Sequence, residues 1–550
     1  MSQKQICSIT GKLFIISDAE IALRETLGVA LPIVHPNERM RELLSWRNDS
    51  TLYAHACDNC KKSILSFFNP TNTFPQYCRV CYFSDSWQAP QKEIDFSRPF
   101  FEQVHELYNA TPSWALAVTE PMENSDYCNA VTAMKNCYMC FNAGFCENCI
   151  YVKTGMHNKE CVDTLVFGNS EIAYECMGGG HGYKLFWSQQ VIKCTESYFL
   201  YDCQDCMNCF MSCGLRHKQY VFRNVQMNKE EYEREIGSID FGSFSTIKAL
   251  EQEFEAMKKS YPKPRMIGVQ NEAVSGNHIY ACKDVYESYL MEQAENCVNC
   301  YDCVNLVKDC LDVCTFGYGL EQGYCSMGLG HNDYNVRYSV ATIENSINCE
   351  YCLECRNCSD CFGCTGISKK QYCILNKQYT KEEYEIQKKG LIDHMHETGE
   401  YGSFFPKSMC PFGYNETVAQ LTLPLSQEQA RMLGFKWYEK PIPAYSQQDV
   451  YTPLDNIKDI AWTDVQGKVI VCEESGRPFK IIKQEFDFYK KYSIPLPRLH
   501  PEVRVKNRYP TDELYNLHTT QCSACGVEVE TSMPDTDSVL CEACYQKQIY

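Results

Sequence analysis

The feature that most restricts the fold of this chain is a spacing of three residues between cysteines. In CEYCLECRNCSDCFGC (Cys349–Cys364), six cysteines follow one another at this interval. Side chains three apart drift around an α-helix of about 3.6 residues per turn, and a strict period-two alternation of strands is lacking as well. Short β-prone pieces such as CIYV, TLVF, SYFLY and QYCIL lie between Asn, Asp and Gly residues. The pattern predicts a mainly β chain with short helices, built on a β-solenoid with cysteine as its compact interior residue.

Asparagine often stands directly before these cysteines. Its short side chain bonds its own backbone and tolerates positive φ, which suits tight turns. We therefore expect tight turns with positive φ at seven positions: Asn136, Asn148, Asn208, Asn296, Asn299, Asn348 and Asn357.

Composition indicates the compartment. The chain has 37 cysteines in 550 residues, an odd number, and neither a basic-then-apolar leader nor an apolar run of 18 residues. This favours a cytoplasmic protein without membrane contact, whose thiols are metal ligands or buried side chains, with disulfides as the last choice. The net charge of −18 disfavours non-specific nucleic-acid binding by the whole chain and leaves a local basic face open.

Two metal-based interpretations of the central thiols stand beside the structural one, which we favour. Cys203, Cys206, Cys209 and Cys213 have the spacing of a bacterial ferredoxin run, although Gly214 replaces the usual proline. An iron–sulfur protein is therefore one alternative. Several zinc sites are the other, because 26 cysteines lie between Cys128 and Cys373, but repeated CxxC steps without loops define no unique groups of four.

The middle of the chain is duplicated. YDCQDCMNCFMSCGLRHKQYVFRNVQMNKEEYE aligns with LECRNCSDCFGCTGISKKQYCILNKQYTKEEYE at an offset of 152 residues, which places Thr365 opposite Cys213. MGGGH (Met177–His181) similarly matches MGLGH (Met327–His331). We predict solenoid repeat A at 125–245, a helical linker at 246–270, repeat B at 271–406 and a linker with short helices at 407–465. Helices are expected from Lys229, over 246–261 and over 381–389.

The two ends of the chain are also copies, at a constant offset of 465 residues. Residues 1–90 and 466–550 each carry two CxxC knuckles, which offer the four thiolates that a closed structural zinc site needs. The predicted ligands of two Zn²⁺ ions are Cys57, Cys60, Cys78 and Cys81 in the first module, and Cys522, Cys525, Cys541 and Cys544 in the second.

The first half of each module resembles a zinc-binding domain family with the pattern CxxCGxxF…CPxCR. Three family cysteines are replaced here, by Thr10, His35 and Glu38 in one copy and by Ser475, His500 and Val503 in the other. The ligands that remain, Cys7 with His35 and Cys472 with His500, do not complete a site. We expect metal-free relics whose buried Cys and His have structural roles; a two-ligand metal site or a pH switch is the minority alternative.

Most of the chain also resembles one large family. The motifs are NEAVSGNHIYACKDVYES (Asn271–Ser288), CFGCTGISKKQYCILNKQYTKEEYE, EYGSFFP, PFGYNETVAQLTLPLS and GFKW. They are similar to an uncharacterised cysteine-rich zinc-ribbon and β-solenoid family of bacteria with very small genomes. Some members carry the label "CaiB/BaiF family", which implies coenzyme A transfer, but no residue pattern here supports that activity.

Two functions of different classes follow. The chain has no P-loop, GxGxxG, HExxH or GxSxG motif. The favoured function is a non-enzymatic zinc-binding scaffold or interaction protein whose partner is a protein, with nucleic acid bound through the ribbon modules as a further option. The alternative is an enzyme with its site in the solenoid groove, using His181 or His331.

Overall fold

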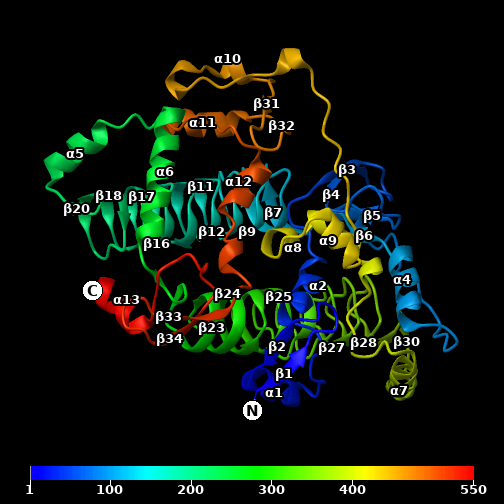
Figure 1. Ribbon diagram of the computed structural model, residues 1–550. Helices are drawn as coiled ribbons and strands as arrows, with labels where there is room; N and C mark the ends of the chain where they lie inside the picture. Colours follow the sequence, from blue (N-terminus) through cyan, green and yellow to red (C-terminus); the bar gives the residue numbers. More distant parts are fainter. Residues whose placement is uncertain (1, 550) are drawn as a thin grey trace.

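The computed structural model describes residues 2–549, which form mainly strands with helices between them. Two stacks of parallel strands lie side by side (Figure 1). The first stack runs from Val118 to Gln226 and the second from Gly268 to Gln378. An N-terminal module (residues 2–90) and a C-terminal module (466–549) pack against them, and both termini lie near the second stack (Figure 1). The Asn142 amide donates to the Asp302 carboxylate at 3.0 Å and links the two stacks directly.

Matching elements recur in the two modules. The helix α1 begins at Asp18, and α11 begins 465 residues later at Lys483. The N-terminal module contains β1 Gln3–Ile6, β2 Leu13–Ile16, α1 Asp18–Leu27, α2 Pro36–Leu44, β3 Tyr53–Ala56, β4 Ser63–Ser66, β5 Gln76–Tyr77 and α3 Arg79–Tyr82. The C-terminal module contains β31 Ile470–Val471, β32 Pro478–Phe479, α11 Lys483–Tyr492, α12 Pro501–Arg508, β33 His518–Gln521, β34 Glu528–Thr531, β35 Val539–Leu540 and α13 Glu542–Ile549.

In the first stack each turn of the chain after the first takes twelve residues. Leu165 lies beside Met177, and Met177 lies beside Gln189, in parallel register. Its strands are β7 Val118–Glu123, β8 Asn129–Lys135, β9 Phe141–Gly144, β10 Lys153–Met156, β11 Lys159–Val162, β12 Leu165–Gly168, β13 Glu171–Tyr174, β14 Met177–Gly180, β15 Tyr183–Phe186, β16 Gln189–Ile192, β17 Thr195–Gln204, β18 Met207–Cys213, β19 Gln219–Phe222 and β20 Val225–Gln226.

The second stack is built in the same way with some longer turns. Tyr289 pairs with Tyr301, twelve residues on, whereas Leu311 pairs with Tyr324, thirteen residues on. Its strands are β22 Gly268–Val269, β23 Glu272–Tyr280, β24 Lys283–Val298, β25 Tyr301–Gly317, β26 Tyr324–Gly330, β27 Ile347–Glu350, β28 Ser359–Phe362, β29 Gln371–Ile374 and β30 Lys377–Gln378.

The spacing of three comes from the backbone corners. In the first stack nearly every third residue from Asn124 to Arg223 has positive φ, so the chain turns after each short extended piece. The residue after the corner points inward, and this is where cysteine stands. All seven asparagines predicted to have positive φ have it, between 49° and 55°. Positive φ is unfavourable for most L-residues and is tolerated best by Asn-like side chains. At the many corners occupied by other residues, packing across the stack therefore has to hold this conformation.

Buried thiols in the stacks take part in backbone hydrogen bonding. The Cys137 thiol donates to the Lys135 carbonyl at 3.3 Å, and the Ser197 hydroxyl makes the same bond to Thr195 at 2.7 Å. The N–H of Cys140 donates to the sulfur of Cys128, twelve residues earlier. Cysteine and serine therefore serve the same interior role, in which a small side chain satisfies backbone groups of adjacent turns.

Helices close each stack at its C-terminal end. The helices α5 (Lys229–Gly237) and α7 (Lys381–Thr398) follow the two stacks and begin with capping boxes at Asn228 and Thr380. The predicted starts are right, but α7 continues well beyond the predicted 389 and is not broken by Gly390. α6 covers Phe244–Ser260. The segment CIYV is not a strand: Ile150 makes only isolated bridges, to Tyr138 and Val162.

The remaining elements connect modules and stacks. They are α4 Phe100–Ala110, β6 Ser113–Trp114, β21 Lys263–Pro264, α8 Val418–Thr422, α9 Gln427–Met432, α10 Trp462–Val465, and short 3₁₀ turns that include η4 Ile457–Asp459. No helix among residues 2–549 is both long and apolar enough to cross a membrane.

Candidate metal centres

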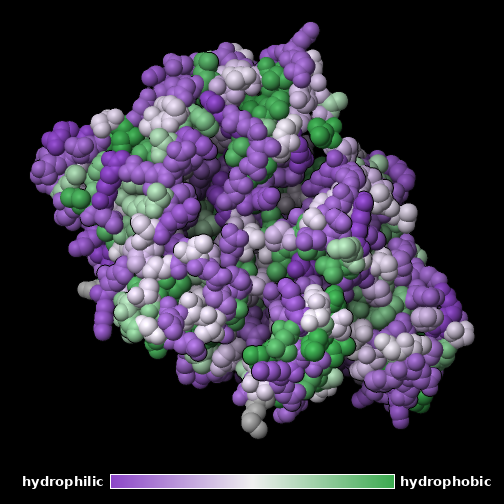
Figure 2. Space-filling view, viewed as in Figure 1, coloured by the Kyte–Doolittle hydropathy of each residue, from purple (hydrophilic) through white to green (hydrophobic). Residues whose placement is uncertain are grey.

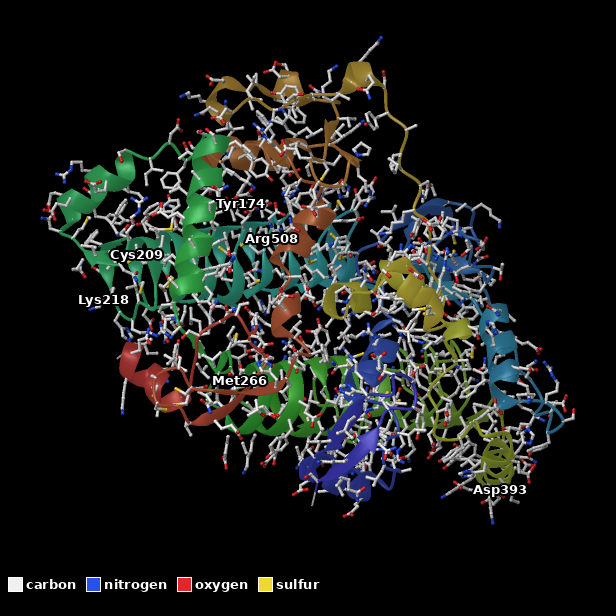
Figure 3. All side chains as sticks on the ribbon, viewed as in Figure 1. Tyr174, Cys209, Lys218, Met266, Asp393 and Arg508 are labelled. Atoms are coloured by element: carbon white, nitrogen blue, oxygen red, sulfur yellow. The ribbon has the colours of Figure 1, made fainter. Side chains whose placement is uncertain are left out.

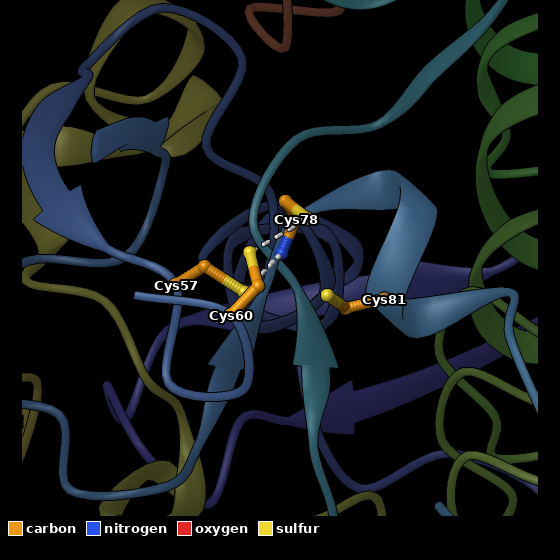
Figure 4. A group of neighbouring side chains, drawn as sticks. All are labelled: Cys57, Cys60, Cys78 and Cys81. Carbon is orange, nitrogen blue, oxygen red and sulfur yellow. Dashed lines mark hydrogen bonds between the residues drawn. The ribbon is translucent and has the colours of Figure 1, made fainter. Parts of the chain in front are cut away.

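The four cysteines predicted in the N-terminal module come together at one point (Figure 4). Cys57 and Cys60 lie in the knuckle between β3 and β4, which is closed by a bond from the Lys61 N–H to the Cys57 carbonyl at 2.8 Å. Cys78 caps the N-terminus of α3, and Cys81 lies in its only turn. All four sulfur atoms are within 4.8 Å of one another, which is the separation a single bound ion requires.

The C-terminal module repeats this group with Cys522, Cys525, Cys541 and Cys544, also within 4.8 Å. The Cys525 and Cys541 sulfurs are 3.7 Å apart, and those of Cys60 and Cys78 are 3.8 Å apart. Four thiolates at about 2.3 Å from a tetrahedral Zn²⁺ ion are roughly 3.8 Å from each other, so both groups fit a closed zinc site. The geometry shows two possible metal sites and does not identify the metal, because a tetrahedral set of four sulfurs suits both zinc and iron.

Backbone donors prepare one thiol of each group for ionisation. Burial raises the pKa of Cys57, but N–H groups of Cys60 and Cys78 donate to its sulfur, and the pKa falls to about 6. The Cys541 N–H lowers the pKa of Cys522 to about 6 in the same way. Burial and bonds to neighbouring thiols raise the pKa of Cys81 to about 12. Ligation therefore has to displace protons from part of each group, which couples metal affinity to pH.

The first half of each module forms no metal group among the described residues. The His35 Nδ1 accepts from the Asn37 N–H at 3.1 Å and caps α2, while the His35 N–H donates to the Cys7 sulfur at 3.4 Å. In the C-terminal copy His500 caps α12 through the Glu502 N–H at 3.2 Å. Burial lowers the pKa of His500 to about 4, so this cap stays neutral. These contacts support a structural role for both pairs.

Each sulfur group stands at the start of one stack. β5, just before Cys78, pairs in parallel with β6, which leads into the first stack. β35, just before Cys541, pairs in parallel with β21, which leads into the second stack. A metal ion in either group would therefore fix the segment from which a stack begins.

The first halves of the modules contact the opposite stacks through buried ion pairs. In the N-terminal module Arg39 bonds Glu20 at 2.8 Å and Asp312 of the second stack at 2.5 Å. At the corresponding positions of the C-terminal module, Arg504 pairs with Glu485 at 3.5 Å and with Asp163 of the first stack.

Arg508 of α12 adds a bond to Asp163 at 2.8 Å and lies beside Tyr174 in Figure 3, which also places Cys209 farther along the first stack. Each module thus touches both stacks. The sequence carries a signal for this network, because both modules contain the motif His-Pro-x-x-Arg, which ends at Arg39 in one copy and at Arg504 in the other.

The two duplicated histidines lie at exposed corners. His181 has φ 56° and His331 has φ 61°, and the His331 ring stacks on Tyr318 at 5.5 Å. A cavity of about 120 Å³ between the first stack, the second stack and α13 includes Gly179, but His181 does not line it. The carboxylates that line this cavity, Asp202 and Glu542, therefore do not share it with His181.

The ferredoxin-like cysteines are divided between two cores. Cys203, Cys206 and Cys209 belong to the interior of the first stack. Cys213 belongs to the apolar cluster outside that stack, against α6 and the C-terminal module. Among residues 2–549, groups of three or more side chains placed to hold a single metal ion occur only at the two terminal sets. Cys213 lies in a different core from the other three thiols, so the four do not converge on one site. The break in spacing at Cys213 moves it off the inward-facing register.

Comparisons with known proteins add no relationship. No family model and no curated protein matches the chain. A solved structure of a protein described as a "putative acetyltransferase" from Desulfovibrio desulfuricans G20 is 11% identical, covers 40% of this chain and 52% of that chain, and has a TM-score of 0.08. This likeness carries no argument about fold or activity.

Proposed function

We propose that this chain is a cytoplasmic, non-enzymatic scaffold or interaction protein that binds two structural zinc ions and presents paired β-solenoids to a protein partner. The observation that carries the proposal is the assembly of two closed four-cysteine groups, one at the start of each stack. A closed tetrahedral site leaves no position for substrate or water, so zinc there stabilises structure.

The stacks support the solenoid part of the proposal. Their parallel register of twelve or thirteen residues, their inward-facing cysteines and their capping helices occur in both halves of the middle region. Solenoids expose long regular faces that bind partners, and both stacks here are held side by side by the modules. Nucleic acid bound through the ribbon modules is the second partner class, to be judged by the same experiment.

Metal analysis tests the zinc sites. Protein purified without added metal is expected to contain two zinc ions per chain. Cys60→Ser should reduce this to one, and Cys472→Ser should leave two, because Cys472 makes no metal group. A folded wild-type chain without zinc, or iron with visible charge-transfer absorbance, would contradict the proposal.

Crosslinking in the native cell tests the scaffold role. A specific protein partner should be recovered with wild-type chain and lost when both zinc sites are disrupted by Cys60→Ser and Cys525→Ser. His181→Ala and His331→Ala should retain the partner. If either histidine variant remains fully stable but loses the cellular phenotype of the wild type, the enzyme alternative replaces the scaffold.

A further inference from the structure

The outer face of the β1–β2 hairpin is apolar and exposed. The hairpin contributes Ile6 (63% exposed), Ile9 (43%), Leu13 (61%) and Ile15 (56%), and the loop after α1 contributes Leu31 (41%) and Ile33 (61%). We call these six side chains the hairpin face. In Figure 2 a hydrophobic patch lies over this hairpin. Together these side chains expose an apolar area of roughly several hundred Å², on the order of the largest patch that a monomer normally shows.

One edge of this hairpin has unpaired backbone groups. The Cys7 N–H donates to the Lys12 carbonyl, so the alternation of an antiparallel pair turns the N–H and C=O of Lys4 and Ile6 away from β2. Among the described residues β1 pairs with β2 alone. An apolar face beside an open strand edge is a surface on which another chain can add a strand.

The C-terminal module shows how the equivalent edge is used. Val469 corresponds to Lys4, and its N–H donates to the Asp449 carbonyl at 2.8 Å. Its carbonyl accepts from the Tyr451 N–H, also at 2.8 Å. Residues 449–451, which begin the segment 449–465 of this same chain, therefore add to that edge in the parallel direction.

The same segment also covers the adjacent helix α11. The Trp462 ring lies 5.6 Å from Phe486, and the Lys490 ammonium donates to the carbonyls of Ile457 at 2.7 Å and Ile460 at 2.8 Å. Leu496, the counterpart of Leu31, is 1% exposed in the cluster that includes these residues.

Three of the six counterparts in the C-terminal module are charged, while Val471 and Pro478, the counterparts of Ile6 and Leu13, are apolar and half-buried. Glu474 stands in place of Ile9 and Lys480 in place of Ile15, and both are exposed. Arg498, in place of Ile33, stacks on the Phe244 ring at 3.9 Å. The module that has its own cover thus carries charge at three positions where the N-terminal module, which has no such cover, exposes isoleucine.

We propose that the hairpin face receives an extended, apolar segment of a partner protein that adds a strand to β1 and places a basic group beside Glu25. Glu25 occupies the position of Lys490 and is exposed, so the ammonium that bonds the cover in one module is replaced by a carboxylate in the other. The patch is smaller than the about 800 Å² per partner of a stable interface between folded proteins, which favours a segment over a second copy of this chain. The inference rests on the proposed scaffold function and identifies its docking surface.

Peptide selection tests the surface with the full-length, zinc-loaded chain. The probe is a library of random twelve-residue peptides displayed on phage, and individual selected peptides are measured by fluorescence polarisation. Selected peptides are expected to alternate apolar residues with at least one Lys or Arg. Ile15→Glu should weaken their binding at least tenfold, because it places a carboxylate on the apolar face next to the strand that the peptide joins, whereas Lys480→Glu at the equivalent position should leave it unchanged.

Hydrogen exchange gives an independent readout. Bound peptide should slow exchange of the Lys4 and Ile6 amides at least tenfold, since these N–H groups would join a strand pair. The inference would be overturned by peptides that bind the Ile15→Glu variant as tightly as the wild type, or that leave both amides unprotected. A concentration-dependent dimer that Ile15→Glu abolishes would also overturn it and assign the face to a second copy. If the Ile15→Glu variant still crosslinks to the partner, the proposed docking surface is wrong but the scaffold function stands. If the wild-type chain crosslinks to no partner, the scaffold function itself is wrong.

Discussion

Replacing Arg504 by methionine should detach the C-terminal module from the first stack. The guanidinium is 4% exposed and pairs with Asp163 and Glu485, both fully buried. It also lies over the Tyr151 ring, 4.7 Å from its centroid. Methionine keeps much of the side-chain volume but leaves two carboxylates without this cation.

The size of the effect follows from what remains around the two acids. Removing one partner of a buried ion pair costs about 3–5 kcal/mol, because the other charge stays buried. Asp163 keeps Arg508 at 2.8 Å. Burial raises the pKa of Glu485 to about 7 even with Arg504 present, so without this cation it takes up a proton near neutrality. We therefore expect the lower end, about 3 kcal/mol, which corresponds to roughly 100-fold in an opening equilibrium.

Hydrogen exchange of the amides in α11 and α12 is the measurement, because a chain of this size need not unfold in one step. Exchange should be about 100-fold faster in Arg504→Met, while amides of the second stack stay near wild type. Arg477→Met is the matched control. Arg477 pairs with Glu502 in the same module, but the two side chains are 27% and 39% exposed, so its loss should change exchange less than fivefold.

Unchanged exchange in α12 of Arg504→Met would refute the argument that this buried network holds module and stack together. Equal acceleration in both variants would show that the effect arises from charge within the module and not from contact with Asp163.

Four further results are expected. Gly179→Ala should lower the free energy of unfolding by more than about 2 kcal/mol in chemical denaturation. The φ of Gly179 is 107°, and a Cβ there would lie 2.0 Å from the Val191 carbonyl oxygen. Gly237→Ala is the control and should not lower it, because the space around Gly237 is open. Burial raises the pKa of Asp333 to about 8, despite two backbone N–H donors. Its contribution to stability is full below the unfolded pKa near 4 and is lost progressively as pH rises toward 8. The melting temperature should therefore fall more steeply between pH 5 and 8 in wild type than in Asp333→Asn. Chelation or Cys60→Ser should unfold the N-terminal knuckle, seen as rapid proteolysis there, because structural zinc contributes on the order of 10 kcal/mol. The buried thiols of the stacks should react with a thiol reagent only after denaturation; rapid reaction in the native state would contradict their interior placement.

Short sequence patterns were sufficient to predict several local features of the structure. Four cysteines in two knuckles define a metal group because each CxxC turn places its own sulfurs, and both groups appear as predicted from spacing alone. Asparagine before cysteine correctly located corners with positive φ, since that preference belongs to the residue itself. The same holds for the capped starts of α5 and α7. The constant offset of 465 residues likewise placed α1 and α11 at matching positions.

Contacts between distant segments were decided only by the tertiary structure. Nothing in the spacing of Arg39 or Arg504 shows that their acids belong to the opposite stacks, because a buried ion pair depends on which surfaces pack together. Only the tertiary structure decided three further features. They are the twelve-residue register, the exclusion of Cys213 from the interior, and the segment that covers one hairpin but not the other. These features depend on how many short extended pieces make up one turn of the stack and on which segment reaches an open strand edge. Packing between residues that are far apart in the sequence sets both.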